Sequence, residues 1–212
     1  MDQLGVDQMN SEFWNELCGT GLAKSLGITD HTPESLKRFD DAYFAFYPYF
    51  LPIIDPARTA GKDVLEIGLG YGSLGQKLAE AGCRYHGLDI AANAARMTNL
   101  RLQMQGFQGR AVQGSAHAMP FPDESFDFVY SIGCFHHTGN VQRCFDETYR
   151  VLRPGGVAVM MVYNKFSFRQ WTRWPWITFK DLLREWGLLS SIDVATEAVS
   201  YTHLTLPTIL RV

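Results

Sequence analysis

The chain has 212 residues, of which 46% are hydrophobic and 19% charged, and its formal net charge is -3. This length is enough to bury one sizeable core, so we expect one main domain with additions. The weak acidity excludes a bulk electrostatic attraction for nucleic acid or for an anionic membrane.

Helical patterns dominate the N-terminal part of the chain. Residues 11–28 read as two short helices broken by glycines. Thr32 is suited to cap the next helix, because its hydroxyl can accept a backbone N–H bond and Pro33 fits the first helical position. Apolar residues then recur at helical spacing until prolines follow. We therefore expect an N-terminal helical extension over residues 1–60.

Short β-rich runs alternate with helical runs after this extension, which is the pattern of βαβ units and a mainly parallel sheet. The predicted strands are 62–67, 84–89, 110–113, 126–132 and 157–163, and the predicted helices between them are 73–81, 92–105 and 141–152. The last helix should stop at RPGG, because Pro154 cannot continue it. The fold class is thus α/β with a doubly wound sheet, whose ligands bind beyond the carboxyl ends of the strands.

A glycine-rich loop follows the first predicted strand. Gly70, Gly72 and Gly75 spell G-x-G-x-x-G, which by itself is a weak indication of a dinucleotide site. Glu66 would place a carboxylate at the mouth of this loop, where it disfavours a pyrophosphate and favours a cationic ligand such as S-adenosylmethionine. Asp89, at the end of the second strand, can accept hydrogen bonds from the ribose hydroxyls of either NAD or S-adenosylmethionine.

Four segments stand in order along residues 62–163: VLEIGLGYG, GLDIA, GSAHAMPFPDESFDFVYSIGCFHHTGN and RVLRPGG. Their order and spacing resemble the class I S-adenosylmethionine-dependent methyltransferases, most of all the bacterial type 11 group. The resemblance implies S-adenosylmethionine as cofactor and a Rossmann-like sheet of seven strands whose last two form an antiparallel edge. The residues that it places around the cofactor are Glu66, Gly68, Gly70, Gly72, Asp89, Ile90, Ser115, Ala116 and Ile132.

Ser115 departs from this family, which more often has Asp at the position to accept a hydrogen bond from the adenine amino group. A hydroxyl can still accept that bond, but a neutral acceptor is roughly half as strong as a charged one. Adenine recognition is therefore expected to rest more on Ala116 and its backbone.

Two histidines follow the fourth predicted strand, where the resemblance brings a loop toward the methyl-transfer site. His136 or His137 could act as a general base near neutral pH, and the alternative is a structural pair in the loop. No further metal ligands stand at suitable spacing, so no metal site is expected. The family often transfers the methyl group mainly by orienting the acceptor for in-line attack, which requires no dedicated base.

The C-terminal part of the chain leaves several alternatives open. Residues 164–180 interleave aromatic and basic side chains, as in a packing element, a substrate cap or a patch that rests on lipid headgroups; we treat 164–198 as this cap or as remaining core. Residues 199–212 look like a translated sequencing adapter and are expected to be a non-native tail. The natural chain would then be truncated near Ala198 and its edge strands incomplete.

The cysteines and the N-terminus indicate a cytoplasmic protein. The cysteines are scattered and form no C-x-x-C pair, which favours reduced, buried thiols: Cys18, Cys83, Cys134 and Cys144. The first residues, MDQLGVDQMNSEF, lack the basic and apolar regions of a signal peptide. The longest apolar run, VAVMMVY, is too short to span a bilayer.

The sequence therefore predicts an S-adenosylmethionine-dependent methyltransferase that acts on a small molecule. One alternative is an NAD-dependent oxidoreductase, supported by the glycine pattern and Asp89 alone. A second is a non-catalytic S-adenosylmethionine-binding module. A nucleic-acid substrate is not expected, because the chain is acidic and has no Asn/Asp-Pro-Pro-Tyr motif. The oligomeric state is left open.

Overall fold

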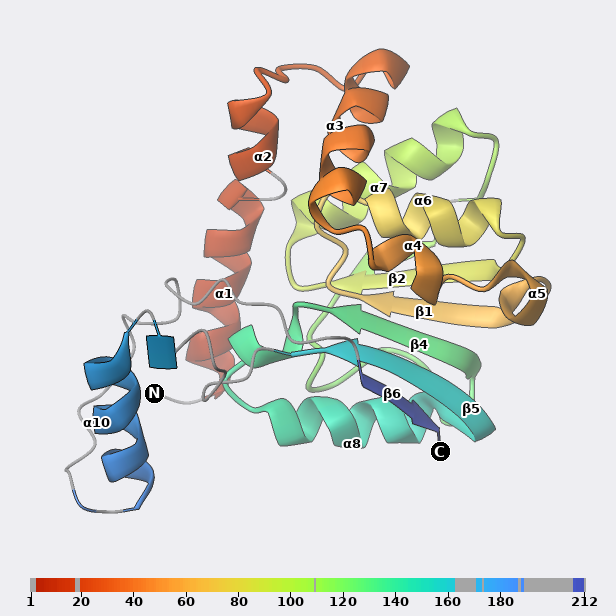
Figure 1. Ribbon diagram of the computed structural model, residues 1–212. Helices are drawn as coiled ribbons and strands as arrows, with labels where there is room; N and C mark the ends of the chain where they lie inside the picture. The colour runs from red at the N-terminus through yellow and green to blue at the C-terminus, as the bar shows by residue number, and fades with distance from the viewer. Residues whose placement is uncertain are drawn as a thin grey trace.

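The computed structural model (Figure 1) describes residues 3–17, 20–108, 110–162, 171–172, 174–186, 188 and 208–211. Its strands are β1 (Asp63–Ile67), β2 (Arg84–Asp89), β3 (Ala111–Gln113), β4 (Phe126–Ile132), β5 (Leu152–Met161) and β6 (Thr208–Arg211). Its helices are α1 (Gln3–Leu17), α2 (Thr20–Ser25), α3 (Pro33–Phe46), α4 (Phe50–Ile53), α5 (Pro56–Thr59), α6 (Ser73–Glu80), α7 (Ala92–Met104), α8 (Val141–Val151) and α10 (Pro175–Glu185).

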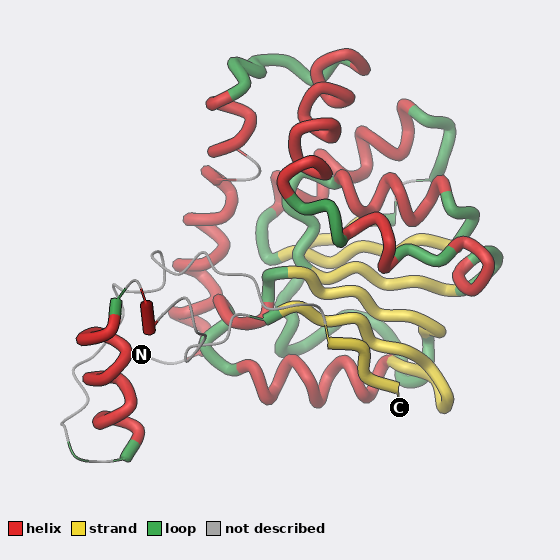
Figure 2. The backbone as a smooth tube through the Cα atoms, in the orientation of Figure 1, coloured by secondary structure: helices red, strands yellow, loops and turns green. Residues whose placement is uncertain are grey.

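The strands form one sheet in the order β3-β2-β1-β4-β5-β6, in which β1 to β5 run parallel and β6 runs antiparallel to β5. Figure 2 shows helices on both faces of this sheet. The chain moves outward from β1 in both directions, and this reversal of strand order opens a crevice where the strands end. The predicted doubly wound α/β fold is confirmed.

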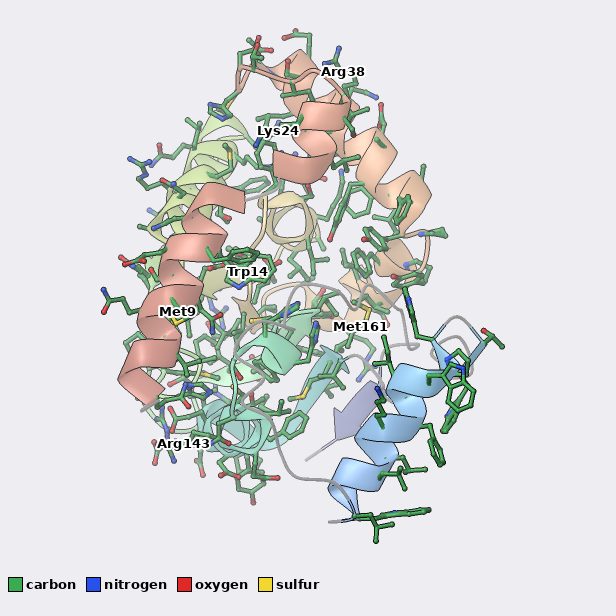
Figure 3. The ribbon with its side chains drawn as sticks, turned by 90° about the vertical axis from the view of Figure 1, so that its left-hand side faces the viewer. Met9, Trp14, Lys24, Arg38, Arg143 and Met161 are labelled. Atoms are coloured by element: carbon green, nitrogen blue, oxygen red, sulfur yellow. The ribbon has the colours of Figure 1, made fainter. Side chains whose placement is uncertain are left out.

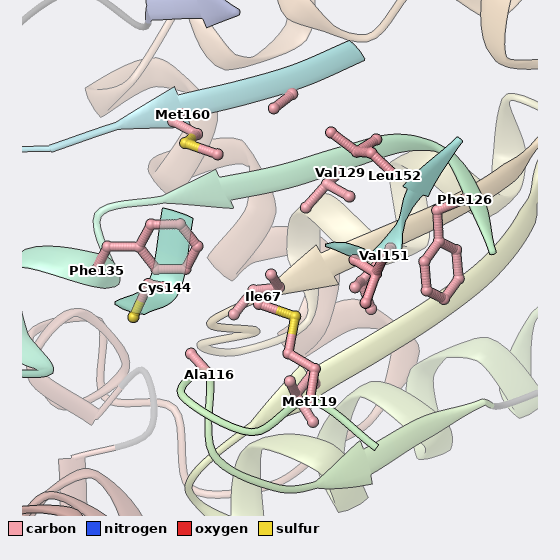
Figure 4. Packing of buried hydrophobic residues seen from close by; sticks show 13 residues of the cluster. Ile67, Ala116, Met119, Phe126, Val129, Phe135, Cys144, Val151, Leu152 and Met160 are labelled. Carbon is pink, nitrogen blue, oxygen red and sulfur yellow. The ribbon is translucent and has the colours of Figure 1, made fainter. Parts of the chain in front are cut away.

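Alternation along the strands divides the core into two layers. Leu65 and Ile67 of β1 pack with residues of α8, whereas Val64 packs beneath α6 and α7. Figure 4 shows the first layer, in which Ile67, Phe135, Cys144 and other apolar side chains fill the space between the sheet and α8. A sheet buried on both faces needs apolar residues at odd and even positions alike, which is why its strands read as nearly continuous apolar runs.

The N-terminal helices are joined to this core by a buried ion pair. Asp40 of α3 accepts a hydrogen bond from the guanidinium of Arg101 in α7, whose side chain is fully buried. Ser73 at the start of α6 also donates to Asp40, at 2.5 Å. Thr32 caps α3 as predicted, since its hydroxyl accepts the Ser35 N–H at 3.3 Å. The extension is thus fixed to the sheet through α6 and α7.

The strand β5 begins at Leu152 rather than at residue 157, which corrects the predicted boundary. RPGG lies inside the strand as an irregularity between the pairs Phe126 with Leu152 and Phe128 with Val157. Hydrogen bonds from an arginine and the conformation of a glycine accommodate this irregularity. Arg153 donates to the carboxylates of Asp63 and Asp127 at 2.9 Å, and Gly155 takes a φ of 79° that favours glycine.

The C-terminal segments are described in part. The sequence sets residues 199–212 apart from the fold, whereas Thr208–Arg211 pair with β5 as an edge strand; residues 199–207 and 212 lie outside the described residues. Of the aromatic and basic segment, residues 164–170 and 173 also lie outside them. Within α10, Trp176 is 77% exposed. None of the described helices is both long and apolar enough to cross a bilayer.

Glu66 is buried in the core layer beneath α6, with 2% of its surface exposed. The hydroxyl of Tyr85 donates to its Oε2 atom at 2.6 Å. Gly75 packs against this pair so closely that a Cβ there would lie 2.5 Å from the Tyr85 hydroxyl and 2.8 Å from Oε2. Burial, with a smaller contribution from the charge of Asp89, raises the pKa of Glu66 to about 8. The group is therefore mostly protonated at neutral pH.

We expect Glu66→Gln to flatten the dependence of stability on pH. The pKa of Glu66 is higher in the folded chain than in the unfolded one, so its favourable contribution is complete below the unfolded value and is lost as pH rises toward 8. One such proton changes the free energy of unfolding by at most about 1.4 kcal/mol per pH unit. Melting temperatures between pH 5 and 8 should fall more steeply for the wild type than for the variant.

The exposed Glu34 of α3 provides a matched control for this measurement. Glu34→Gln should follow the wild-type curve, since it removes a carboxyl group that is in contact with solvent. Wild-type and Glu66→Gln curves that run parallel from pH 5 to 8 would show that Glu66 does not retain its proton in the folded chain.

Candidate active site

A cavity of ≈200 Å³ lies at the edge of the sheet where the strands end. Its walls come from the segments that follow β1, β2, β3 and β4, together with α1. The predicted site residues that line it are Gly68, Gly70, Asp89, Ile90, Ser115, Ala116, Ile132 and His137. These residues are far apart in the sequence, and the parallel strands bring them to one place.

The glycine loop after β1 passes close to the loop after β4. Gly68 has a φ of 83°, and a Cβ at this position would lie 2.5 Å from the Cβ of Cys134. Gly72, with a φ of 78°, begins α6 and packs against Thr98 of α7. Side chains at either position would push the loop away from its neighbours. Gly68 thus lets the backbone that lines the cavity lie close to Cys134.

Asp89 joins the two central loops of the cavity. Its Oδ2 atom accepts the N–H of Leu69 at 2.7 Å, and its Oδ1 atom accepts the N–H of Ala91 at 2.8 Å. Burial raises the pKa of Asp89, against the opposing effect of these two N–H groups and that of Gly70. Each oxygen has further lone pairs, which can accept hydrogen bonds from hydroxyl groups of a ligand.

The helix α1 covers the cavity, which the sequence did not predict. Figure 3 views the molecule from this side and shows Trp14 pointing inward from α1. Asn10 donates to the His137 carbonyl at 2.9 Å, and Ser11 donates to the Ile90 carbonyl at 3.0 Å. The available signal was the spacing of Asp7, Asn10 and Ser11, which places three short polar side chains on one helical face.

Ser115 lies opposite Asp7 of this helix. The hydroxyl of Ser115 donates to Oδ2 of Asp7 at 2.6 Å, and its oxygen accepts the N–H of His117 at 3.2 Å. Nδ1 of His117 lies 3.4 Å from Oδ1 of Asp7. Ser115 thus lines the cavity beside a carboxylate that comes from the N-terminal extension.

Three of the predicted residues do not line this cavity. Glu66 points into the core layer beneath α6, which corrects its expected place at the mouth of the loop, because even positions of β1 face α6 and α7. Gly72 instead is the N-cap residue of α6. His136 lies beside the cavity, and burial lowers its pKa to about 3.

His137 does line the cavity, and its ring lies 5.0 Å from that of Trp14 and 4.0 Å from that of His136. Burial lowers the pKa of His137, so its imidazole is neutral at neutral pH. A neutral imidazole can accept a proton, but its lowered pKa makes it a weaker base than an exposed histidine.

Comparison with known proteins finds methyltransferases that are similar to part of this chain. Residues 65–160 match the family described as "Methyltransferase domain". A demethylmenaquinone methyltransferase of Tropheryma whipplei is 32% identical over 107 residues, which are 50% of this chain and 44% of that protein. A fatty-acid O-methyltransferase of Mycolicibacterium smegmatis is 36% identical over 120 residues, or 55% of this chain and 43% of that one. The chain thus spans less than half the length of these two relatives.

A solved structure agrees with the sequence comparison. The YcgJ protein of Bacillus subtilis superposes with a TM-score of 0.51 and 26% identity, over 54% of this chain and 50% of that one. The matched segment runs from Leu65 in β1 to Met160 in β5 and contains the glycine loop, Asp89 and Ser115. Residues 65–160 are therefore similar in sequence to methyltransferase domains, and they share the fold of this solved structure.

Proposed function

We propose that this cavity binds S-adenosylmethionine and that the protein transfers its methyl group to a small-molecule acceptor. The observation that carries the proposal is the charge of the cavity. Its described lining residues include Asp7 and Asp89 and no lysine or arginine. A pyrophosphate would meet two acidic groups there, whereas a ligand with a sulfonium and an ammonium group meets complementary charge.

The residues of the cavity would act by binding and positioning. Asp89 would accept hydrogen bonds from the ribose hydroxyls, and the backbone of Gly68 and Gly70 would lie along the methionine part. Ile90 and Ala116 offer apolar contacts for the flat base. Bound S-adenosylmethionine supplies an electrophilic methyl group. The enzyme's contribution is then to hold the acceptor in line with the S–CH₃ bond and to keep water out.

The acceptor that we propose is an apolar small molecule. The two curated relatives described above are named for a menaquinone precursor and for a fatty acid. In this chain, α10 exposes large aromatic side chains, with Trp176 77% and Phe179 43% exposed. Figures 1 and 3 place α10 on the same side of the sheet as α1, where the strands end. An apolar acceptor would find its contact surface there.

We also propose that the protein works in the cytoplasm and does not act on nucleic acid. The described cysteines Cys83, Cys134 and Cys144 are free thiols, as expected in a reducing compartment, and Cys18 lies outside the described residues. The net charge of -3 gives no general attraction for phosphate backbones.

Binding measurements test the cofactor directly. We expect calorimetric titration to show micromolar binding of S-adenosylmethionine or its demethylated product, and no measurable binding of NAD. Methyl transfer would then be assayed against a long-chain fatty acid, a demethylated quinone and a sterol, by formation of S-adenosylhomocysteine. Binding of NAD at tens of micromolar (roughly 6 kcal/mol) without a response to S-adenosylmethionine would refute the proposed function.

Substitutions at Asp89 and Ser115 test the placement of the nucleoside. Asp89→Ala removes charge-assisted hydrogen bonds worth roughly 1.5–3 kcal/mol each, so affinity for S-adenosylhomocysteine should fall about ten- to a hundredfold or more. Ser115→Ala removes at most one neutral bond to the ligand, of about 0.5–1.5 kcal/mol, and should cost less than about tenfold. A larger loss for Ser115→Ala than for Asp89→Ala would mean that the ribose does not lie at Asp89.

A further inference from the structure

Asp7 and Asp89 are the two acidic residues among the described lining of the cavity. Asp7 belongs to α1, outside the segment that matches the methyltransferase family. Its Oδ2 atom accepts the Ser115 hydroxyl at 2.6 Å, and its Oδ1 atom lies 3.4 Å from Nδ1 of His117. Its side chain retains 23% of its exposure, on the cavity side of α1.

The order of the strands fixes which part of the ligand reaches Asp7, and this step rests on the proposed function. The sheet runs outward from β1 through β2 to β3. With the methionine part at the glycine loop after β1 and the ribose at Asp89 after β2, the base extends to the segment after β3. That segment contributes Ser115, Ala116 and His117 to the cavity.

The hydrogen-bonding capacity at this end favours Asp7 over Ser115 as the acceptor. Ser115 has a single hydroxyl proton, which it donates to Asp7, and its oxygen already accepts the His117 N–H. A carboxylate has about four lone-pair sites and makes the stronger, charge-assisted bond to an N–H donor. Asp7 accepts the Ser115 hydroxyl and also the Gln3 amide, at 2.9 Å, so about two of its lone-pair sites remain for an exocyclic amino group.

We propose that Asp7 accepts a hydrogen bond from the amino group of the adenine base. In this arrangement α1 supplies the carboxylate that the segment after β3 lacks, and Ser115 positions it. Adenine recognition in this protein is then shared between the family segment and the N-terminal extension.

A pair of ligands separates base recognition from a purely structural role of Asp7. S-adenosylhomocysteine carries the amino group, and S-inosylhomocysteine carries an oxygen in its place and a proton on the neighbouring ring nitrogen. If Asp7 only fixes α1 to the sheet, its loss weakens both ligands by the same factor. If Asp7 binds the amino group, its loss weakens mainly the adenine ligand.

The experiment measures dissociation constants of both ligands by calorimetry for the wild type, Asp7→Ala, Asp7→Asn and Glu12→Gln. Glu12 is an exposed acid of the same helix, so Glu12→Gln controls for the loss of one charge from α1. We expect Asp7→Ala to reduce the preference for the adenine ligand at least about fivefold, and Glu12→Gln to leave it unchanged. Asp7→Asn should also reduce it, since an amide can turn its NH₂ toward the oxygen of the inosine ligand.

Moving the carboxylate from position 7 to position 115 should restore the preference for the adenine ligand. In the Asp7→Ala background, Ser115→Asp should restore the preference for adenine, because an acid again stands at this end of the cavity. In the wild-type background, Ser115→Asp places a second carboxylate beside Asp7, where the Ser115 hydroxyl now lies 2.6 Å from it. The repulsion between the two like charges should weaken binding.

Each outcome has a definite meaning. Equal losses for both ligands in Asp7→Ala, or rescue that fails although the variant melts like the wild type, would overturn the role of Asp7 and leave the proposed function standing. A wild-type protein that binds neither ligand would refute the proposed function, and this inference with it. If Asp7→Ala does not fold, Asp7→Asn and Glu12→Gln alone decide the matter.

Discussion

The shape of the cavity depends on one carboxylate that two loops share. Parallel strands bring the ends of β1 and β2 to the same edge, but they do not determine how far apart the following loops lie. Asp89 sets this distance by accepting the N–H groups of Leu69 and Ala91. A partly buried N–H that loses its acceptor costs about 1–3 kcal/mol, so two such groups hold the loops firmly. The positions of Gly70 and Ile90 follow from this contact.

The sequence predicted the sheet well because burial on both faces leaves a local signal. The bounds of β2 and β4 matched their apolar runs, and Thr32 with Pro33 marked the start of α3. The start of β5 was misplaced, because proline and glycine usually break a strand and the bulge that holds them depends on a distant ion pair. Glu66 was misplaced because an acid is normally exposed, whereas strand alternation turned it inward to Tyr85.

The part of the cavity that sequence reasoning missed comes from long-range contacts. The helix α1 meets the cavity through single polar side chains, such as Asn10 at His137 and Ser11 at Ile90. The spacing of such residues can place them on one helical face, but it does not identify their partners, which are distant in the chain. The family match begins at residue 65, after this helix. The segment that matches the family therefore contains most of the loops that form the cavity, whereas the helix that covers it lies outside that segment.

The buried ion pair between Asp40 and Arg101 determines which parts of the chain can be removed without destabilising the rest. A fragment trimmed to the family segment would keep Arg101 in the core and lose the acid that neutralises it, and an uncompensated buried charge of this kind typically costs about 3–5 kcal/mol. That is a large share of the stability of a small domain. The boundary drawn by resemblance is thus not the boundary of the folding unit.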